Sequence, residues 1–200
     1  MHLGRALRLP LSAVLVTAVA LSLTGCDNGG AGGDRARYVT DADGISTVRK
    51  ADRQAAGAMK GETLDGKRLD VAEFRGKVVV MNVWGSWCVP CRAEIPNFVK
   101  VAKEVKGKGV EFVGINTREA SRTQAVAFEK DFHVDYPSLY DPTGKLVLTG
   151  FPKGTLNPQT LPSTIVLDRD GKIAARSLQG LSEERLRKMI DAVLADNADK

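Results

Sequence analysis

Cysteine is scarce in this sequence. The 200 residues contain three, Cys26, Cys88 and Cys91, which excludes a fold held by several disulfides and a structural zinc site built from four cysteines. Histidine is also rare, and His133 is the one histidine beyond the first few residues. A site with two thiolates and one imidazole would need His133 to fold back onto the cysteines. The sequence therefore predicts no metal site and no cofactor.

The numbers of basic and acidic residues are also nearly equal. The chain has 29 Lys and Arg against 24 Asp and Glu, and two of the basic residues, Arg5 and Arg8, lie in a first segment of 25 residues without any acidic residue. The remainder has 27 basic and 24 acidic residues, a balance that gives no support to nucleic-acid binding. With 43% hydrophobic and 26% charged residues, the chain predicts one globular domain with tails.

The apolar stretch at residues 11–23 is short for a transmembrane helix and has the length of a signal-peptide core. It is followed by Leu23-Thr24-Gly25-Cys26, which resembles the lipobox of a bacterial lipoprotein and implies cleavage before Cys26 and lipidation of its thiol. An ordinary secretory signal with an incidental cysteine, or an uncleaved anchor, remains an alternative. We expect a signal peptide at 1–25, a flexible tether at 26–57 and a folded domain at 58–200.

Within the domain, short β-branched runs alternate with amphipathic segments. This alternation, before a final hairpin, predicts a mixed sheet covered by helices. Gly and Pro predict a loop before residue 163, and Ser182 is expected to cap the last helix. Residues 63–69 predict two short strands joined by an Asp-Gly turn. The other predicted strands are 77–83, 110–116, a short strand within 134–141, 163–167 and 172–177. The predicted helical segments are 71–75, the segment from the cysteines to Gly107, 121–132 and 182–195.

The stretch from Val78 to Pro96 holds the two remaining cysteines where a buried strand gives way to a helix. Cys88 at the helix N-terminus is exposed to the positive end of the helix dipole, which favours its thiolate, and Cys91 lies one turn inward. We expect Cys88 to attack and Cys91 to resolve, with Pro90 in the first helical turn. A static disulfide is disfavoured because the loop it closes is very short.

Three separated segments resemble the thioredoxin-fold oxidoreductases of the membrane-tethered TlpA/ResA-like family. The resemblance covers residues 60–195 and implies an α/β thioredoxin-like fold with a central mixed sheet, an N-terminal β-hairpin extension and a helix–strand insert at 119–140. The three matching segments are Trp84-Gly85-Ser86-Trp87-Cys88-Val89-Pro90-Cys91-Arg92-Ala93-Glu94-Ile95-Pro96, Leu161-Pro162-Ser163-Thr164-Ile165-Val166-Leu167-Asp168 and Asp170-Gly171-Lys172-Ile173.

The resemblance also implies the remaining site residues. Glu94, three residues after Cys91, matches an active-site glutamate, and its burial would raise its pKa so that it exchanges protons with Cys91. Asn82 stands where cytosolic thioredoxins have a buried aspartate, which shifts proton handling toward Glu94. Pro162 matches a cis proline, and Leu161 before it would bind an extended substrate segment. Trp87 is expected beside Cys88.

These observations predict a lipid-anchored thiol–disulfide oxidoreductase on the extracytoplasmic face of a bacterial membrane, acting mainly as a reductant. The resemblance implies apocytochrome c or another exported disulfide-containing protein as substrate, and a membrane thiol-transport protein as electron donor. Two alternatives use the same cysteines differently. A metallochaperone-like protein would bind copper(I) through both thiolates, and a peroxiredoxin-type peroxidase would form a sulfenic acid at Cys88.

Overall fold

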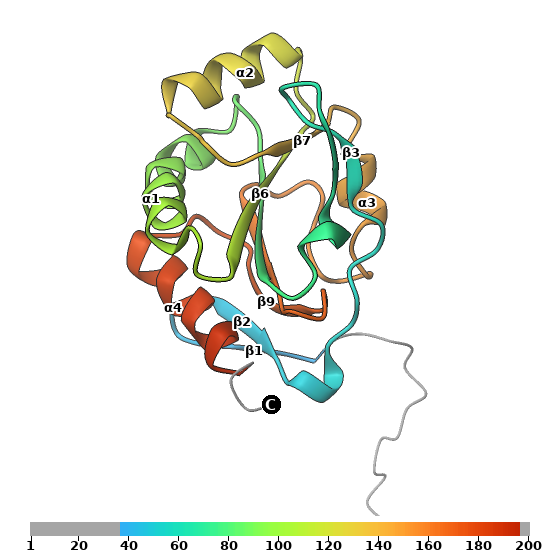
Figure 1. The fold of residues 1–200 in the computed structure, drawn as a ribbon, viewed down its shortest axis with the longest axis vertical. Coiled ribbons are helices and arrows are strands. Elements are labelled where there is room, and N and C mark those ends of the chain that lie inside the picture. Colours follow the sequence, from blue (N-terminus) through green and yellow to red (C-terminus); the bar gives the residue numbers. More distant parts are fainter. Residues whose placement is uncertain (1–36, 197–200) are drawn as a thin grey trace, which may run out of the picture. The chain divides into compact units, whose positions relative to one another are not determined.

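The computed structural model describes residues 37–196, and a mixed sheet of seven strands lies at its centre (Figure 1). The strand order is β1-β2-β9-β8-β5-β6-β7, and β3 and β4 form a separate hairpin. In the described part of the chain the strands are β1 (Tyr38–Thr40), β2 (Ile45–Val48), β3 (Lys60–Glu62), β4 (Arg68–Asp70), β5 (Val78–Trp84), β6 (Val110–Thr117), β7 (Ser138–Asp141), β8 (Ser163–Leu167) and β9 (Ile173–Ser177).

Helices cover both faces of this sheet. Figure 1 shows α1 and α4 side by side on one face and α3 on the other, with α2 near the end where β6 and β7 finish. None of the helices within residues 37–196 is long and apolar enough to span a membrane. In chain order they are α1 (Val89–Val105), α2 (Arg122–Asp131), α3 (Lys145–Thr149) and α4 (Glu183–Ala195), with short 3-10 helices η1 (Lys50–Asp52) and η2 (Val71–Phe74).

The strand β5 is buried along its whole length because it packs against α1 and α4 on one face and against a second core, which includes residues of η2 and α3, on the other. Its side chains alternate, as a pleated strand requires. Val78 and Val80 join the core under α1 and α4, whereas Val79 and Met81 join the core on the opposite face. The strand pairs parallel with β6 and antiparallel with β8, which makes the sheet mixed as predicted.

Most predicted elements are present with small shifts at their ends. The predicted Asp-Gly turn joins β3 and β4, the strands at 163–167 and 172–177 form the antiparallel hairpin β8–β9, and the helix after the cysteines is α1. Ser182 caps α4 by accepting a hydrogen bond from the Arg185 amide at 3.3 Å. The short helix α3 was not predicted, because Gly and Pro on both sides of it favour a loop.

The predicted tether at 26–57 is wrong over its second half. Residues 38–48 form the hairpin β1–β2, and β2 extends the main sheet by pairing with β9, where Ile45 lies opposite Ser177. Ile45 and Val48 are buried. These strands are too short to show a clear alternation of apolar and polar residues. They form because β2 can pair with the edge of β9, which no local pattern indicates. The predicted signal at 1–25 and lipidation at Cys26 lie outside the described residues.

A buried arginine joins the two ends of the described chain. Arg53 follows the hairpin β1–β2, and its guanidinium contacts Asp168 at 3.1 Å in an ion pair whose two side chains are both almost fully buried. The same guanidinium donates to the Val48 carbonyl at 3.1 Å and contacts Asp196, just after α4. The N-terminal segment, the β8–β9 turn and the end of α4 are therefore held by one side chain.

We expect Arg53→Ala to lower the free energy of unfolding by about 3–5 kcal/mol, because it leaves the Asp168 carboxylate buried without its cation. Urea unfolding monitored by circular dichroism measures this change. Arg49→Ala is the matched control, since Arg49 makes an exposed ion pair with Asp52 and its loss is expected to have little effect. An unchanged midpoint for Arg53→Ala would contradict a structural role for the buried pair.

Candidate active site

The two cysteines lie where β5 leads into α1. Cys88 is the N-cap residue of α1, and its sulfur accepts a hydrogen bond from the Cys91 amide at 3.2 Å. The two sulfurs form a disulfide. Cys88 is 4% exposed and Cys91 is fully buried, so Cys88 is the more accessible sulfur. Pro90 lies in the first helical turn, where its missing N–H leaves no hydrogen bond unmade.

A buried carboxylate holds the turn that precedes Cys88. Glu119 accepts hydrogen bonds from the Ser86 amide and hydroxyl, each at 2.8 Å, and from the Asn116 side-chain amide at 3.0 Å. Sequence reasoning missed Glu119 as a site residue. The signal was available, because β5 and β6 run parallel and polar residues just after their carboxyl ends must meet at one edge of the sheet.

The two tryptophans have different surroundings. Trp84 is buried and stacks on Phe128, with ring centroids 4.7 Å apart. Trp87 is 49% exposed, and its indole N–H donates to the Arg118 carbonyl at 2.9 Å while the Arg118 guanidinium lies 5.0 Å from its ring centroid. A β-carbon at Gly85 would come within 2.7 Å of the indole nitrogen, so this glycine lets Trp87 lie back over the turn.

Glu94 is buried at the inner side of the cysteine turn. It lies three residues after Cys91 on α1, so the two residues share one face of the helix. Its carboxylate accepts hydrogen bonds from the Asn82 side-chain amide at 2.8 Å and from the Leu181 amide at 2.9 Å. Burial raises the pKa of Glu94 from 4.5 to about 7, and the two hydrogen bonds offset this only in part. A carboxyl with this pKa can take up and release protons near neutral pH.

Asn82 reaches Glu94 because of the pleat of β5. Its side chain lies on the same face of the strand as Val80, toward α1, and its amide also donates to the Thr164 hydroxyl at 3.3 Å. The amide carries no charge at any accessible pH, so it orients the Glu94 carboxylate without adding a second titrating group. Asn82 and Glu94 were both predicted from the sequence, and the structure brings them together.

The Leu161–Pro162 bond is cis, as the resemblance implies. Leu161 lies just before β8 and packs against the cluster of buried side chains that contains both cysteines and Trp84. Strand β8 pairs with β5, which brings this segment to the end of the sheet where α1 begins. Segments far apart in the sequence, around Cys88, Glu119 and Leu161, therefore meet at one end of the molecule.

No group of three or more His, Cys, Asp or Glu side chains within residues 37–196 is arranged to hold a metal ion. His133 is exposed after α2 and has a positive φ of 56°. Lys100, which is exposed on α1, forms an ion pair with Glu183 at 2.8 Å. These residues belong to the surface of the fold.

Comparisons with known proteins agree with this geometry. The Redoxin family model matches residues 45–194. The chain belongs to the redoxin family. It is 34% identical over 112 residues to the thiol-disulfide oxidoreductase ResA of Bacillus subtilis, covering 56% of this chain and 59% of that protein. It is 28% identical over 130 residues to ResA of Bacillus cereus, covering 65% and 71%.

Solved structures give the same result for the fold. A DsbF homologue from Corynebacterium diphtheriae has a TM-score of 0.67 and 30% identity, covering 80% of this chain and 99% of its own. A secreted thiol-disulfide isomerase from Corynebacterium glutamicum has a TM-score of 0.68 and 30% identity, covering 80% and 98%. This redoxin is therefore a ResA-like thiol–disulfide oxidoreductase with a thioredoxin-like fold, as the sequence predicts.

The buried Glu94 carboxyl makes the stability of this redoxin depend on pH. Its pKa of about 7 in the folded protein lies above the value of 4.5 in the unfolded chain. The unfolded state therefore releases this proton first, and the contribution of Glu94 to stability falls as the pH rises from about 4.5 to 7. We expect the wild type to lose roughly 3 kcal/mol relative to Glu94→Gln across this range.

Urea unfolding of the oxidised protein at several pH values measures the difference. Glu73→Gln is the control, because Glu73 is exposed and its substitution is expected to leave the pH dependence unchanged. Parallel pH profiles for the wild type and Glu94→Gln would show that the folded state does not hold this proton.

Proposed function

We propose that this redoxin is a membrane-anchored, extracytoplasmic reductant of protein disulfides. The observation that carries the proposal is the arrangement at the start of α1, where an N-cap cysteine is joined to a buried cysteine. A buried carboxyl with a pKa of about 7 lies one helical turn farther on. Such a carboxyl can take the proton from the second cysteine near neutral pH, which is the step that resolution of a mixed disulfide requires.

In the first step, the thiolate of reduced Cys88 attacks one sulfur of a substrate disulfide. The substrate S–S bond breaks, a Cys88–substrate disulfide forms, and the displaced substrate sulfur leaves as a thiolate that takes a proton from water. The backbone N–H groups at the start of α1, among them the Cys91 amide, stabilise the Cys88 thiolate before the attack.

In the second step, the Cys91 thiol gives its proton to Glu94, and its sulfur attacks the Cys88 sulfur. The mixed disulfide breaks, the second substrate sulfur leaves as a thiolate, and the substrate has gained two electrons. The enzyme is left with the Cys88–Cys91 disulfide, the state seen in the structure. A dithiol donor must then reduce it, and a membrane thiol-transport protein fits this role.

The substrate surface would lie around Cys88. Trp87 is exposed, and Arg118 holds its ring through the carbonyl hydrogen bond and through the guanidinium. Pro90 is exposed on the first turn of α1, and Leu161, just before β8, packs against the cysteine cluster and is followed by the buried Pro162. We propose that an extended segment of an exported protein, such as apocytochrome c, binds across these residues with its disulfide at Cys88.

The extracytoplasmic location rests on residues 1–26, whose basic start, apolar core and Leu23-Thr24-Gly25-Cys26 ending are typical of a lipoprotein signal. The neighbour from Corynebacterium glutamicum is itself described as secreted. Radiolabelled palmitate incorporated into the wild type and lost in Cys26→Ser would support lipidation. The same label in both proteins would contradict it.

Replacing the resolving cysteine is expected to trap the substrate. With Cys91→Ser, the mixed disulfide at Cys88 cannot be resolved from within the enzyme, so covalent complexes should accumulate in the envelope of expressing cells. Non-reducing electrophoresis and mass spectrometry detect them, and Cys88→Ser is the matched control that should form none.

The absence of any complex with an exported protein would overturn the proposal. Tight copper(I) binding without disulfide reduction would then favour the metallochaperone alternative, and rapid sulfenic acid formation at Cys88 with peroxide would favour the peroxidase.

Removing the buried carboxyl is expected to slow resolution. In Glu94→Gln the proton on Cys91 has no acceptor beside it, so release of the second substrate thiolate should slow by about 100-fold or more near neutral pH. Stopped-flow measurement with a disulfide peptide separates the two steps, because Glu94→Gln should leave the attack by Cys88 nearly unchanged. In the wild type, the resolution rate should rise with pH as Glu94 loses its proton near pH 7.

Glu73→Gln provides the kinetic control, since Glu73 is exposed on η2. Equal resolution rates in the wild type and Glu94→Gln would remove Glu94 from the mechanism. The direction of electron flow is tested separately by equilibration with glutathione, where a potential near that of strong disulfide oxidants would contradict a reductant.

A further inference from the structure

Arg118 lies between the cysteine turn and the segment before the cis bond. Its carbonyl accepts the Trp87 indole N–H at 2.9 Å, and its guanidinium lies 5.0 Å from the centroid of the Trp87 ring. The guanidinium also donates to the side-chain carbonyl of Gln159 at 3.3 Å, in the loop that leads to Leu161. Arg118 therefore contacts both segments across which an extended substrate is proposed to bind.

The backbone of Arg118 has an unfavourable conformation. Its φ of 50° lies in the left-handed region, which side chains other than glycine rarely adopt. The amide donates to the Asp141 carbonyl at 3.4 Å, and the next residue, Glu119, holds the Ser86 amide at 2.8 Å. Residues in such conformations persist where surrounding contacts fix them, and they cluster at functional sites. The contacts on both sides thus keep the Arg118 side chain beside Trp87.

The Arg118 guanidinium retains donors that are not used. Its Nε and Nη2 atoms are buried and have no hydrogen-bond partner within residues 37–196. A buried donor without an acceptor is unfavourable, and more so in a charged group. Trp87 and Gln159, which contact the guanidinium, are themselves exposed, so they can shift to admit a ligand. An acceptor that reaches this guanidinium is therefore strongly favoured.

The carboxylates next to Arg118 already have donors. Glu119 accepts the three hydrogen bonds described above, and Asp141 accepts one from the Val147 amide at 3.2 Å. Both carboxylates are buried. Neither forms an ion pair with Arg118. A bound segment could supply the carboxylate that the described part of the chain does not.

A second arginine lies close to the cysteine turn. Arg92 is exposed on α1 and donates to the Ser86 carbonyl at 3.4 Å. Its guanidinium lies 5.3 Å from the Phe128 ring centroid and 5.2 Å from that of Phe132. Within residues 37–196 it forms no ion pair. Aromatic rings thus hold the guanidinium groups of Arg92 and Arg118 and leave N–H edges for hydrogen bonds.

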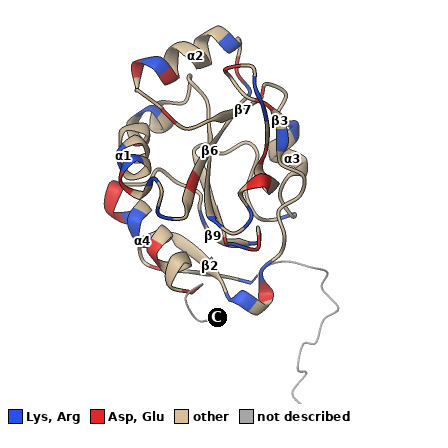
Figure 2. Cartoon of the chain, viewed as in Figure 1, with Lys and Arg blue, Asp and Glu red and all other residues tan. Residues whose placement is uncertain are grey.

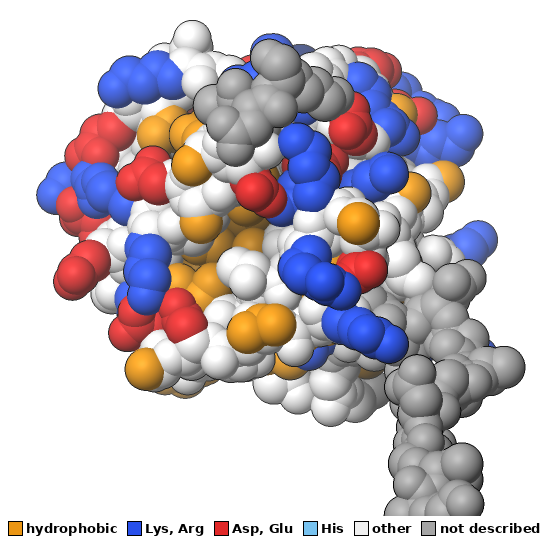
Figure 3. Space-filling view, turned by 90° about the horizontal axis from the view of Figure 1, so that it is seen from below, with side chains coloured by type: hydrophobic (Ala, Val, Ile, Leu, Met, Phe, Trp, Pro, Cys, Tyr) orange, Lys and Arg blue, Asp and Glu red, His pale blue; other side chains and the backbone are white. Residues whose placement is uncertain are grey.

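Elsewhere the surface carries mixed charges, many of them paired. Figure 2 shows basic and acidic positions interspersed among the helices. Figure 3, which views the molecule from below, shows basic and acidic side chains next to one another on that face. Arg53, Arg122 and Arg187, for example, each form an ion pair with a carboxylate. Arg92 and Arg118 are distinguished by lying unpaired beside the disulfide.

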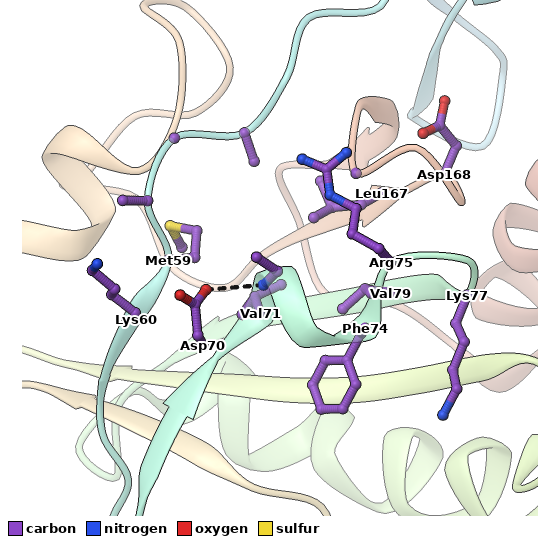
Figure 4. A pocket seen from close by; sticks show the side chains of 15 residues that line it. Met59, Lys60, Asp70, Val71, Phe74, Arg75, Lys77, Val79, Leu167 and Asp168 are labelled. Atoms are coloured by element: carbon purple, nitrogen blue, oxygen red, sulfur yellow. Dashed lines mark hydrogen bonds between the residues drawn. The ribbon is translucent and has the colours of Figure 1, made fainter.

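A cavity beside η2 offers no comparable site. It has a volume of about 270 Å³ and is lined by the segment that leads into β3, by η2 and by the β8–β9 turn. Figure 4 shows the charged ends of Lys60, Arg75 and Lys77 pointing away from one another. Arg75 donates to the Asp170 carbonyl, and Lys77 contacts Glu111 at 2.6 Å. These cations do not converge on one ligand.

We propose that Arg118, assisted by Arg92, selects substrates that carry an acidic residue beside the disulfide. The substrate carboxylate would accept hydrogen bonds from the Arg118 guanidinium while the substrate disulfide lies at Cys88. A carboxylate suits this position because its two oxygens match the parallel N–H donors of a guanidinium. The inference rests on the proposed function, because it names the kind of protein disulfide that the same site prefers.

Disulfide peptides that differ at one position test the proposal on the reduced full chain. The residue next to the reacting cysteine of the peptide is Glu, Gln or Lys. We expect the second-order rate constant for the Glu peptide to exceed that for the Gln peptide by about tenfold, as one charge-assisted contact predicts, and the Lys peptide to be slowest. High salt should reduce the preference because it screens the attraction. Alkylation of the remaining thiols followed by mass spectrometry measures each rate.

Substitutions of the arginines identify the contact. Arg118→Gln should lower the Glu-to-Gln ratio to about twofold, and the double variant with Arg92→Gln to about one. Arg118→Lys should restore part of the ratio, because lysine keeps the charge without the paired donors. Arg122→Gln is the matched control and should preserve the ratio, since Arg122 also lies over a ring, that of Tyr140, but is already paired with Glu62. A ratio measured within one variant is unaffected by a general loss of activity.

Equal rate constants for the Glu and Gln peptides in the wild type would overturn the inference. A ratio unchanged by Arg118→Gln, or lowered equally by Arg122→Gln, would also overturn it. Failure of the proposed function gives a different result. In that case the reduced chain reduces none of the three peptides and Cys91→Ser traps no exported protein, whereas equal reduction of all three peptides rejects only the selection of acidic substrates.

Discussion

The burial of β5 on both faces is the constraint on which the rest of the structure depends. A strand covered by α1 and α4 on one side and by the opposite core on the other has one fixed register and one fixed end. That end is the turn that carries Cys88. Since β6 runs parallel to β5 and β8 runs antiparallel to it, Glu119 and Leu161 are brought to the same turn by backbone pairing. The active site is therefore assembled by the sheet, and the helices supply its sulfur atoms and its buried acid.

Two buried glutamates near this turn do different work because their surroundings differ. Glu119 accepts three hydrogen bonds and holds the backbone before Cys88 in place. Glu94 accepts two, and the desolvation of its carboxyl outweighs them, so its pKa rises to about 7. One carboxylate thus fixes geometry and the other can exchange protons. Asn82 is a neutral partner for Glu94, so it orients the carboxyl without adding a charge of its own.

The two ends of the fold differ in chemistry. At the carboxyl end of β5 the surface combines an exposed Trp87 with an N-cap cysteine, whereas a cavity near the other end is lined by residues of both charges, among them Lys60, Asp70 and Arg75. The buried contact between Arg53 and Asp168 joins the start and the end of the described chain close to that cavity.

The sequence by itself determined the features that depend on short-range pattern: the buried strand before the cysteines, the helix that begins at Cys88, the placement of Glu94 one turn after Cys91, and the final hairpin and helix. With the family resemblance it also indicated the cis bond at Pro162. Only the tertiary structure decided that residues 38–48 extend the main sheet, that Glu119 reaches Ser86, and that Lys60, Arg75 and Lys77 surround one cavity. The reason is physical. Local propensity and periodicity act over a few residues, whereas these contacts join segments that become neighbours only after β5 has paired with β6 and β8.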